Sequence, residues 1–143
     1  MRPKLIALIF FTLMIPFVVG AGQQPPTRIR VSELERMPFI VGTLKITITE
    51  FRGSVLKLLA AYIEVRVENT STEFATFSPQ RLVFVNKDNE QTDILGIRNG
   101  TLPALDKSIA PGARIKQSYV LTEKVRLPAR LYYNEKLLAV IAE

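Results

Sequence analysis

The chain has 143 residues, a formal net charge of +6, and neither histidine nor cysteine. Without these two residue types it contains no Ser-His-Asp or Cys-His catalytic arrangement, no zinc site of the usual kind and no disulfide bond. We therefore expect a protein without catalytic residues, metal or cofactor. Its basic residues are spread along the chain, which is typical of a solvated surface of mixed sign, although the excess charge favours acidic partners.

The first residues have the pattern of a secretory signal peptide. Arg2 and Lys4 precede an almost wholly apolar run at 5–19, and small residues follow at 20–22. This run is short for a bilayer-spanning helix, which needs about 20 residues. We expect residues 1–21 to be a signal peptide cleaved after Ala21, so that the mature protein is secreted or periplasmic. The alternative is an uncleaved N-terminal anchor.

Residues 22–42 are expected to form a polar leader and a possible edge strand. The leader begins with a Pro-Pro pair, which is typical of an extended segment. Ser32 and Glu35 have the spacing of a helix capping box, but Pro38 would end such a helix after about one turn. A short helix and an irregular or edge strand therefore both remain open here.

From residue 43 onwards the sequence predicts strands. Apolar and polar residues alternate, which is the period of a strand with one buried face. The longest alternation puts apolar residues on one face and mostly charged residues on the other. The residues expected to face inward are Leu44, Ile46 and Ile48, and then Leu59, Ala61, Ile63, Val65 and Val67. Those expected to face water on the second strand are Tyr62, Glu64, Arg66 and Glu68.

A hairpin and a loop come next. Strands at 81–85 and 91–97 flank the polar turn NKDNEQ, which has the length of a hairpin connection. The segment 99–108 contains Gly100 and Pro103 and is expected to be a loop.

Two turns punctuate the C-terminal third. Pro111-Gly112 predicts a type II turn ahead of a strand at 114–121. Asn134-Glu135 is a two-residue turn between strands at 130–133 and 136–141. Together, the pattern over residues 43–143 predicts an all-β domain, an immunoglobulin-like antiparallel β-sandwich of about seven to eight strands.

Four local patterns between residues 43 and 142 occur in a characteristic order. They are a strand ending in Val67, Asn69 and Thr70, a turn with Asp88 and Asn89, the turn Pro111-Gly112, and a closing hairpin with Leu131 and Tyr132. In this order they resemble a family of bacterial secreted immunoglobulin-like domains of unknown function, which also includes secreted immunoprotective antigens. The resemblance implies a signal peptide followed by one small sandwich. It supplies no established catalytic residues.

Three aromatic residues are candidates for an interaction surface. Phe74 and Phe77 flank an expected turn, where they either cap one end of the core or, if exposed, mark a binding edge. Tyr132 and Tyr133 point to opposite faces of their strand, so one belongs to the core, in the manner of a tyrosine corner, and the other is exposed. We take Tyr133 as the candidate contact residue.

For the remaining motifs, we favour an explanation by chance or by local structure over a functional one. Ser54 and Lys57 spell S-x-x-K, but the S-D-N and K-T-G partners of that nucleophile motif are missing. The oxygen-bearing residues Asp88, Asn89, Glu90 and Asp93 are a candidate for weak calcium binding, but their spacing is not that of an EF-hand and a solvated turn is favoured. Asn69 and Asn99 begin glycosylation sequons, which matter only in a eukaryotic source.

These observations predict a secreted or envelope-associated, non-enzymatic binding domain. Its partner is expected to be a protein or a cell-envelope component. Nucleic acid is not expected, because no strand interleaves basic and aromatic residues, and membrane contact is expected only through an uncleaved signal. The alternatives are a structural envelope component, or a small hydrolase that uses carboxylates or the Ser54–Lys57 pair.

Overall fold

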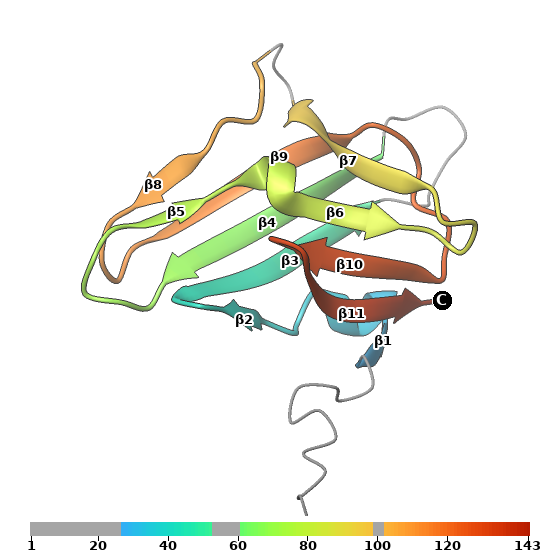
Figure 1. Ribbon diagram of the computed structural model, residues 1–143, viewed down its shortest axis with the longest axis horizontal. Coiled ribbons are helices and arrows are strands. Elements are labelled where there is room, and N and C mark those ends of the chain that lie inside the picture. The colour runs from blue at the N-terminus through green and yellow to red at the C-terminus, as the bar shows by residue number, and fades with distance from the viewer. Residues whose placement is uncertain (1–26, 53–60, 99–101) are drawn as a thin grey trace, which may run out of the picture.

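The computed structural model describes residues 27–52, 61–98 and 102–143. Nearly all of its regular structure is β (Figure 1). The elements are β1 (Arg28–Arg30), α1 (Val31–Leu34), β2 (Phe39–Val41), β3 (Leu44–Arg52), β4 (Tyr62–Asn69), β5 (Ala75–Phe77), the 3-10 turn η1 (Pro79–Arg81), β6 (Leu82–Val85), β7 (Gln91–Ile97), β8 (Lys107–Ile109), β9 (Arg114–Leu121), β10 (Ala129–Tyr133) and β11 (Lys136–Ala142).

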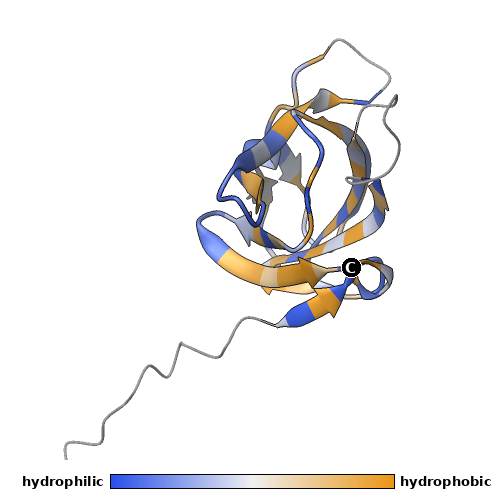
Figure 2. Ribbon diagram, turned by 90° about the vertical axis from the view of Figure 1, so that its right-hand side faces the viewer, coloured by the Kyte–Doolittle hydropathy of each residue, from blue (hydrophilic) through white to orange (hydrophobic). Residues whose placement is uncertain are grey.

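Nine strands form one sheet in the order β1-β11-β10-β6-β7-β9-β4-β3-β2, and β5 pairs with β8 in a separate two-stranded sheet. β7 belongs to both halves of the large sheet. Its first residues pair with β6, and the residues from Ile94 onwards pair with β9, with a register shift between Ile94 and Gly96. The sheet therefore curls at β7, and its two halves enclose one core (Figure 2).

The predicted all-β class is confirmed, but the expected purely antiparallel pairing is wrong at one edge. β1 runs parallel to β11, with Ile29 beside Ile141, so the large sheet is mixed. A parallel neighbour was not foreseen because the segment before residue 43 shows too little alternation to be read as a strand that joins a distant partner.

Most of the predicted strands lie close to their expected positions. Ile63, Val65 and Val67 on β4, and Ala61 just before it, lie inward and are buried, as the alternation predicts. The β6–β7 hairpin, β9 and the β10–β11 hairpin also follow the prediction. The short strands β5 and β8 were missed, since each has three residues and lies in an expected turn or loop.

A bulge in β3 explains why its alternation stops. Ile48 pairs with Val65 and Glu50 with Glu64, so one extra residue, Thr49, lies between two successive pairs. The extra residue reverses the order of inward and outward positions. Phe51 consequently points inward and packs on Phe84, with ring centroids 5.7 Å apart.

The segment before residue 43 supplies both edges of the sheet. β1 and β2 are the two outermost strands, and α1 lies between them in the chain and contacts β1, β3 and β11. We call the gap between the free edges of β1 and β2 the seam. Leu34 of α1 is fully buried there. Both open alternatives therefore occur, a one-turn helix and an edge strand, but the cap is formed by the Arg30 N–H and the Glu33 carboxylate, 2.8 Å apart, and not by Ser32 and Glu35.

Several predictions fall on residues outside the described ranges. They are the signal peptide at 1–21, the beginning of the leader, the Ser54–Lys57 motif, the inward position of Leu59 and the sequon at Asn99. Within the described ranges, no helix has the length and apolar character needed to cross a bilayer.

Candidate functional site

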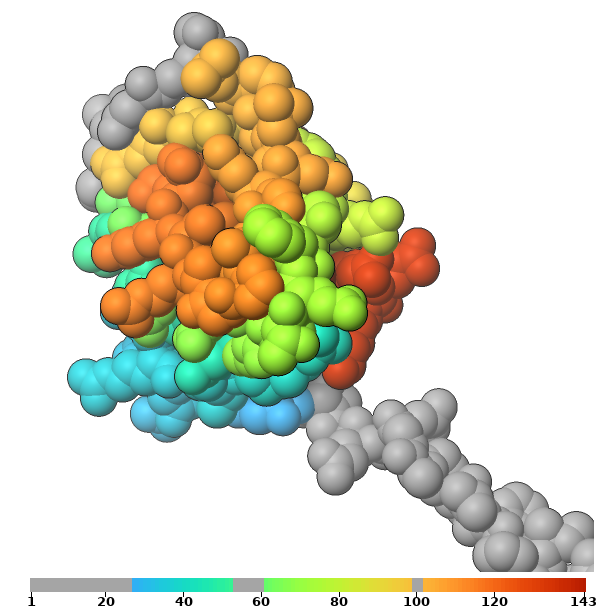
Figure 3. All heavy atoms as spheres, turned by 90° about the vertical axis from the view of Figure 1, so that its left-hand side faces the viewer, coloured from blue at the N-terminus to red at the C-terminus, as the bar shows by residue number. Residues whose placement is uncertain are grey.

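A depression of about 610 Å³ lies at the end of the molecule where the β2–β3 and β10–β11 turns meet the start of β5. Figure 3 shows this face, on which the segments around β2 and β3 (cyan to teal), β5 (green) and β10–β11 (red) adjoin. We call this hollow the end depression. It is lined by Val41, Gly42, Thr43, Leu44, Phe74, Ala75, Thr76, Ser78, Arg81, Asp106, Tyr133 and Asn134.

The structure brings the three predicted aromatic residues together but gives them different roles. Phe74 is 72% exposed and lines the end depression. Phe77 and Tyr133 are buried, and their rings stack with centroids 5.4 Å apart and an interplanar angle of 13°. Phe77 therefore caps the core, and Tyr133, which we took as the exposed contact, is the core member of its tyrosine pair. Phe74 remains as the exposed aromatic candidate.

Tyr133 contributes its phenol to the floor of the end depression. Its Oη accepts a hydrogen bond from the Ser78 backbone N–H at 3.0 Å, which fastens β10 to the start of η1. Burial raises the pKa of this phenol and nearby Asp106 adds to the rise, whereas the Ser78 hydrogen bond and Arg81 oppose it. The hydroxyl is therefore neutral and still has its own proton to donate.

Two charged residues border the same hollow. The Arg81 guanidinium donates a hydrogen bond to Asn134 Oδ1, which holds it against the β10–β11 turn. Asp106 lies on the other wall. An exposed ring, a neutral phenol, a cation and a carboxylate can recognise a partially polar partner, but they include no nucleophile paired with a general base.

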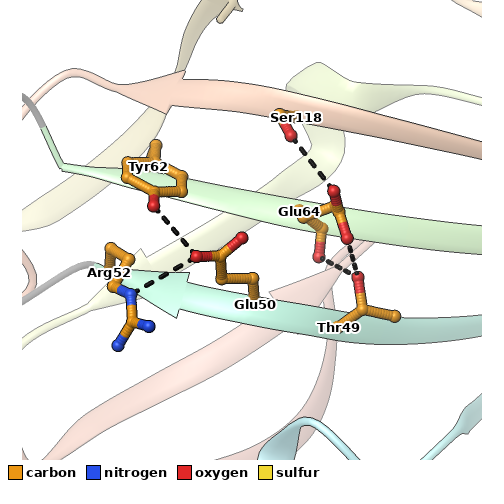
Figure 4. A network of polar contacts seen from close by, with 6 residues as sticks. All are labelled: Thr49, Glu50, Arg52, Tyr62, Glu64 and Ser118. Atoms are coloured by element: carbon orange, nitrogen blue, oxygen red, sulfur yellow. Dashed lines mark hydrogen bonds and ion pairs between the residues drawn. The ribbon is translucent and has the colours of Figure 1, made fainter.

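A pair of carboxylates that lie opposite each other on neighbouring strands is found elsewhere, on the outward face of β3 and β4 (Figure 4). Glu50 and Glu64 are paired in the register of the two strands. Glu50 Oε1 accepts a hydrogen bond from Tyr62 Oη at 2.9 Å and lies 3.4 Å from Arg52 Nε.

The surroundings of Glu64 favour its charged form. The Thr49 hydroxyl donates to Glu64 Oε1 at 2.7 Å, and Lys116 Nζ lies 3.1 Å from that oxygen. The pKa of Glu64 is lowered, first by the Thr49 hydrogen bond and then by Lys116 and Ser118, against a smaller opposing effect of burial. Two-carboxylate hydrolysis needs one carboxyl group that keeps its proton, and the surroundings of Glu64 do the opposite.

In the polar turn between β6 and β7, side-chain oxygen atoms form hydrogen bonds and an ion pair with other residues of the protein. Asp88 lies 3.6 Å from Arg126 Nη1, and Asn89 Oδ1 accepts a hydrogen bond from Arg130 Nη2 at 2.7 Å. Glu90 Oε2 accepts one from Asn86 Nδ2 at 3.2 Å. Nowhere in the described ranges do three His, Cys, Asp or Glu residues gather as a metal site would require. The solvated-turn interpretation therefore accounts for these residues.

Asn69 is an internal structural residue in this fold. Its side chain is fully buried, and Nδ2 donates hydrogen bonds to the Glu73 and Ile109 carbonyls at 2.6 and 3.0 Å. Nδ2 is the atom to which a glycan would be joined, so the folded chain does not present this sequon for modification. The predicted sequon at Asn69 is therefore not a modification site of the folded protein.

A larger depression, of about 910 Å³, lies at the opposite end near the β6–β7 turn. Its floor includes Val125 and Leu127, and charges of both signs surround it. None of the residues predicted as contacts lines it. The charged rim consists of Lys87, Glu90, Glu123, Lys124, Arg126 and Glu143.

No protein-family model matches the chain, and no curated protein matches it. Among solved structures, the chain is similar to the crystal structure of the yjhA protein from Bacillus subtilis, with 18% sequence identity and a TM-score of 0.49. The similarity covers 79% of this chain and 84% of that one. At this level it carries no information about activity.

Proposed function

We propose that the chain is an exported, non-enzymatic binding domain that contacts a protein or cell-envelope component through the end depression. The observation that carries this proposal is the exposure of Phe74 beside a hollow with polar groups. The phenyl ring of Phe74 is 72% exposed, so a partner that covers it removes apolar surface from water, and this makes the free energy of binding more favourable. Arg81, Asp106 and the Tyr133 hydroxyl would then orient that partner.

An immunoglobulin-like arrangement supports the choice of this end. The β11-β10-β6 and β9-β4-β3 groups of strands face one another across a shared core, as the two sheets of a sandwich do. Turns at one end of such a scaffold carry binding residues in many domains, because the strands hold them rigidly. The end depression is built from turns and strand ends of both groups.

Export is supported by the pattern of residues 1–21. Mass spectrometry of the protein recovered from its native cells tests this part of the proposal. The expected chain begins at Gly22 and is found outside the cytoplasm. A cytoplasmic chain that retains residues 1–21 would contradict export and leave the contact surface to be tested separately.

Site-specific photo-cross-linking tests the contact surface. A photoreactive phenylalanine analogue placed at Phe74 in the native cells is expected to give a discrete adduct with one partner. The matched control places the same analogue at Leu95, which is 65% exposed and does not line the end depression. Adducts of equal yield at both positions, or none at position 74, would refute the end depression as the contact site.

A further inference from the structure

The positive charge of the described chain is concentrated on one surface, the outward face of β3, β4 and β9. Most side chains of this face are the outward residues of three neighbouring strands, and Arg98 joins them from the end of β7 by lying 3.6 Å over the Tyr62 ring. Its basic residues are Lys45, Arg52, Arg66, Arg98, Arg114 and Lys116, and its acidic residues are Glu50, Glu64 and Glu68. Six cations against three carboxylates leave this face with three positive charges, which equals the net charge of the described residues, in which 16 Lys and Arg stand against 13 Asp and Glu.

Three of these cations, Arg66, Arg114 and Lys116, form a cluster that has no evident role in stabilising the sheet. Arg66 and Lys116 are direct partners across β4 and β9, and Arg114 lies two residues along β9 on the same face. Like charges directly opposite each other destabilise a sheet. In the described ranges neither Arg66 nor Arg114 forms an ion pair, whereas Lys116 pairs with Glu64. A hollow of about 320 Å³ lies between these residues.

The neighbours of this basic cluster are hydrogen-bonding groups suited to hydroxyls. Glu64 is held as a carboxylate and accepts hydrogen bonds from Thr49 at 2.7 Å and Ser118 at 3.5 Å, the latter long and readily replaced. Figure 4 shows the three side chains on one face of β3, β4 and β9, and the register places Glu64 and Ser118 two residues from Arg66 and Lys116 on the same face. The surface therefore has cations that can bind acidic groups. One residue pair further along β4 and β9 it has a carboxylate and hydroxyl groups that can form hydrogen bonds with neutral polar groups.

We propose that this face binds an anionic polysaccharide, a sugar chain that carries carboxylate or phosphate groups. Arg66, Arg114 and Lys116 neutralise the acidic groups, with the two guanidinium groups able to form bidentate hydrogen bonds. Glu64 and Ser118 accept and donate hydrogen bonds to adjacent hydroxyls. Acidic sugar chains carry acidic groups and hydroxyls close together, just as the basic cluster and the Glu64–Ser118 pair lie next to each other on this face.

The same surface is poorly suited to nucleic acid. Single-stranded nucleic acids bind proteins through aromatic rings on which bases stack. Tyr62 is the outward-facing ring of the described parts of β3, β4 and β9, and the Arg98 guanidinium already covers it at 3.6 Å. The proposal does not depend on the end depression, because none of the residues that line the basic hollow lines that site.

A binding titration with matched variants tests the proposal. Purified mature protein is titrated with oligomers of polygalacturonic acid, and with neutral dextran, single-stranded DNA and phosphatidylglycerol vesicles for comparison. We expect polygalacturonate to bind, dextran not to bind, and the affinity to fall as salt is added. The double variant Arg66→Ala/Arg114→Ala is expected to bind roughly tenfold or more weakly, given the usual contribution of one cation to contact with an anionic surface.

The control is Lys107→Ala/Lys136→Ala, which removes the same charge from two exposed positions outside this face. It is expected to bind as the unchanged protein does. Arg66 lies opposite Lys116 and Arg114 lies opposite Glu68, but both arginines are exposed and neither forms an ion pair in the described ranges, so their replacement is expected to change the melting temperature little. A melting temperature close to that of the unchanged protein would show that the variant is folded. Equal weakening in both double variants, tighter binding of DNA or vesicles than of polygalacturonate, or no binding of polygalacturonate at low salt would each overturn the proposal.

Discussion

A single buried amide, that of Asn69, joins three segments of the chain. Its Nδ2 donates to the carbonyls of Glu73 and Ile109, and its Oδ1 accepts from the Ser71 backbone N–H at 3.0 Å. The backbone of Asn69 takes part as well, since its carbonyl accepts the Gly112 N–H at 3.0 Å. Buried polar groups are costly unless every hydrogen bond is made, so this residue determines how the end of β4 meets the loops around β5 and β8.

Replacing Asn69→Ala is expected to lower the free energy of unfolding by about 2–4 kcal/mol, because the buried bond to the Ile109 carbonyl and the part-buried bond to the Glu73 carbonyl are both lost. Chemical denaturation followed by circular dichroism measures this change. The control is Ser71→Ala, which removes a partly exposed hydroxyl from the same cluster and should cost about 1 kcal/mol or less. If the two variants were equally stable, the buried amide would not have the structural role described here.

Phe74 and Phe77 show why the sequence could predict the residues of the candidate site but not which of them is buried and which is exposed. Both are phenylalanines next to an expected turn, and both have the same hydrophobicity. Phe77 is buried because β5 pairs with β8 and places its ring against Tyr133. Phe74 precedes that pairing and is left exposed. The difference depends on a contact between segments about thirty residues apart, which no local pattern contains.

At the scale of elements, the β10–β11 hairpin carries a residue that does not suit its backbone. Asn134 and Glu135 have φ angles of 49° and 67°, which is the left-handed conformation required at both positions of a type I′ turn. Asparagine tolerates this conformation, but for glutamate it is unfavourable by about 1–2 kcal/mol. The turn nevertheless forms because β10 is paired on both sides, with β6 and β11.

Glu135→Gly is therefore expected to stabilise the protein by about 0.5–1 kcal/mol, since the relief of strain exceeds the added flexibility of the unfolded chain. Differential scanning calorimetry should show a higher melting temperature. Glu135→Ala is the matched control: it removes the same charge but keeps the Cβ atom, and should bring no such gain. A gain of the same size in both variants would assign the effect to charge and not to the backbone.

The short strands β5 and β8 and the bulge in β3 belong to the same scale. A strand of three residues is too short to show a period of two, so β5 and β8 exist only through their mutual pairing. The bulge at Thr49 depends on the partner strand β4. The long strand β4, in contrast, buries one face along its whole length and therefore shows its alternation in the sequence.

At the scale of the whole molecule, the first described segment closes the curled sheet. The edges β1 and β2 are separated by a few residues in the chain but lie at opposite ends of the strand order. α1 bridges the seam between them, and Leu34 fills it. An open edge with unpaired backbone groups is a site of misassembly, so this one helical turn protects the sheet as well as stabilising it.

Leu34→Ala is expected to lower the free energy of unfolding by about 2–5 kcal/mol, the range for emptying a fully buried leucine position. Hydrogen exchange should rise first in β1 and β2, because the cavity lies at the seam between them. Glu35→Ala, at the next and exposed position, provides the control and should leave both stability and exchange unchanged. Loss of protection that began in β4 or β9 instead would show that the seam is not where the sheet opens.

Local pattern was sufficient for the all-β class, for the inward face of β4, and for the turns at Pro111-Gly112 and Asn134-Glu135. These features depend on neighbours within a few residues, through the alternation of side chains along a strand and the backbone angles that proline, glycine and asparagine accept. Gly112, for example, has the positive φ of 69° that the predicted turn requires.

Features that join distant segments were decided by the folded chain alone. The parallel contact of β1 with β11, the curl at β7, the burial of Tyr133 and Asn69, and the gathering of Arg66, Arg114 and Lys116 on one face all depend on which strands become neighbours. Strand pairing brings together residues far apart in the chain, and its free energy comes from burying one shared core. That free energy belongs to the complete arrangement of strands, so no single stretch of sequence contains it.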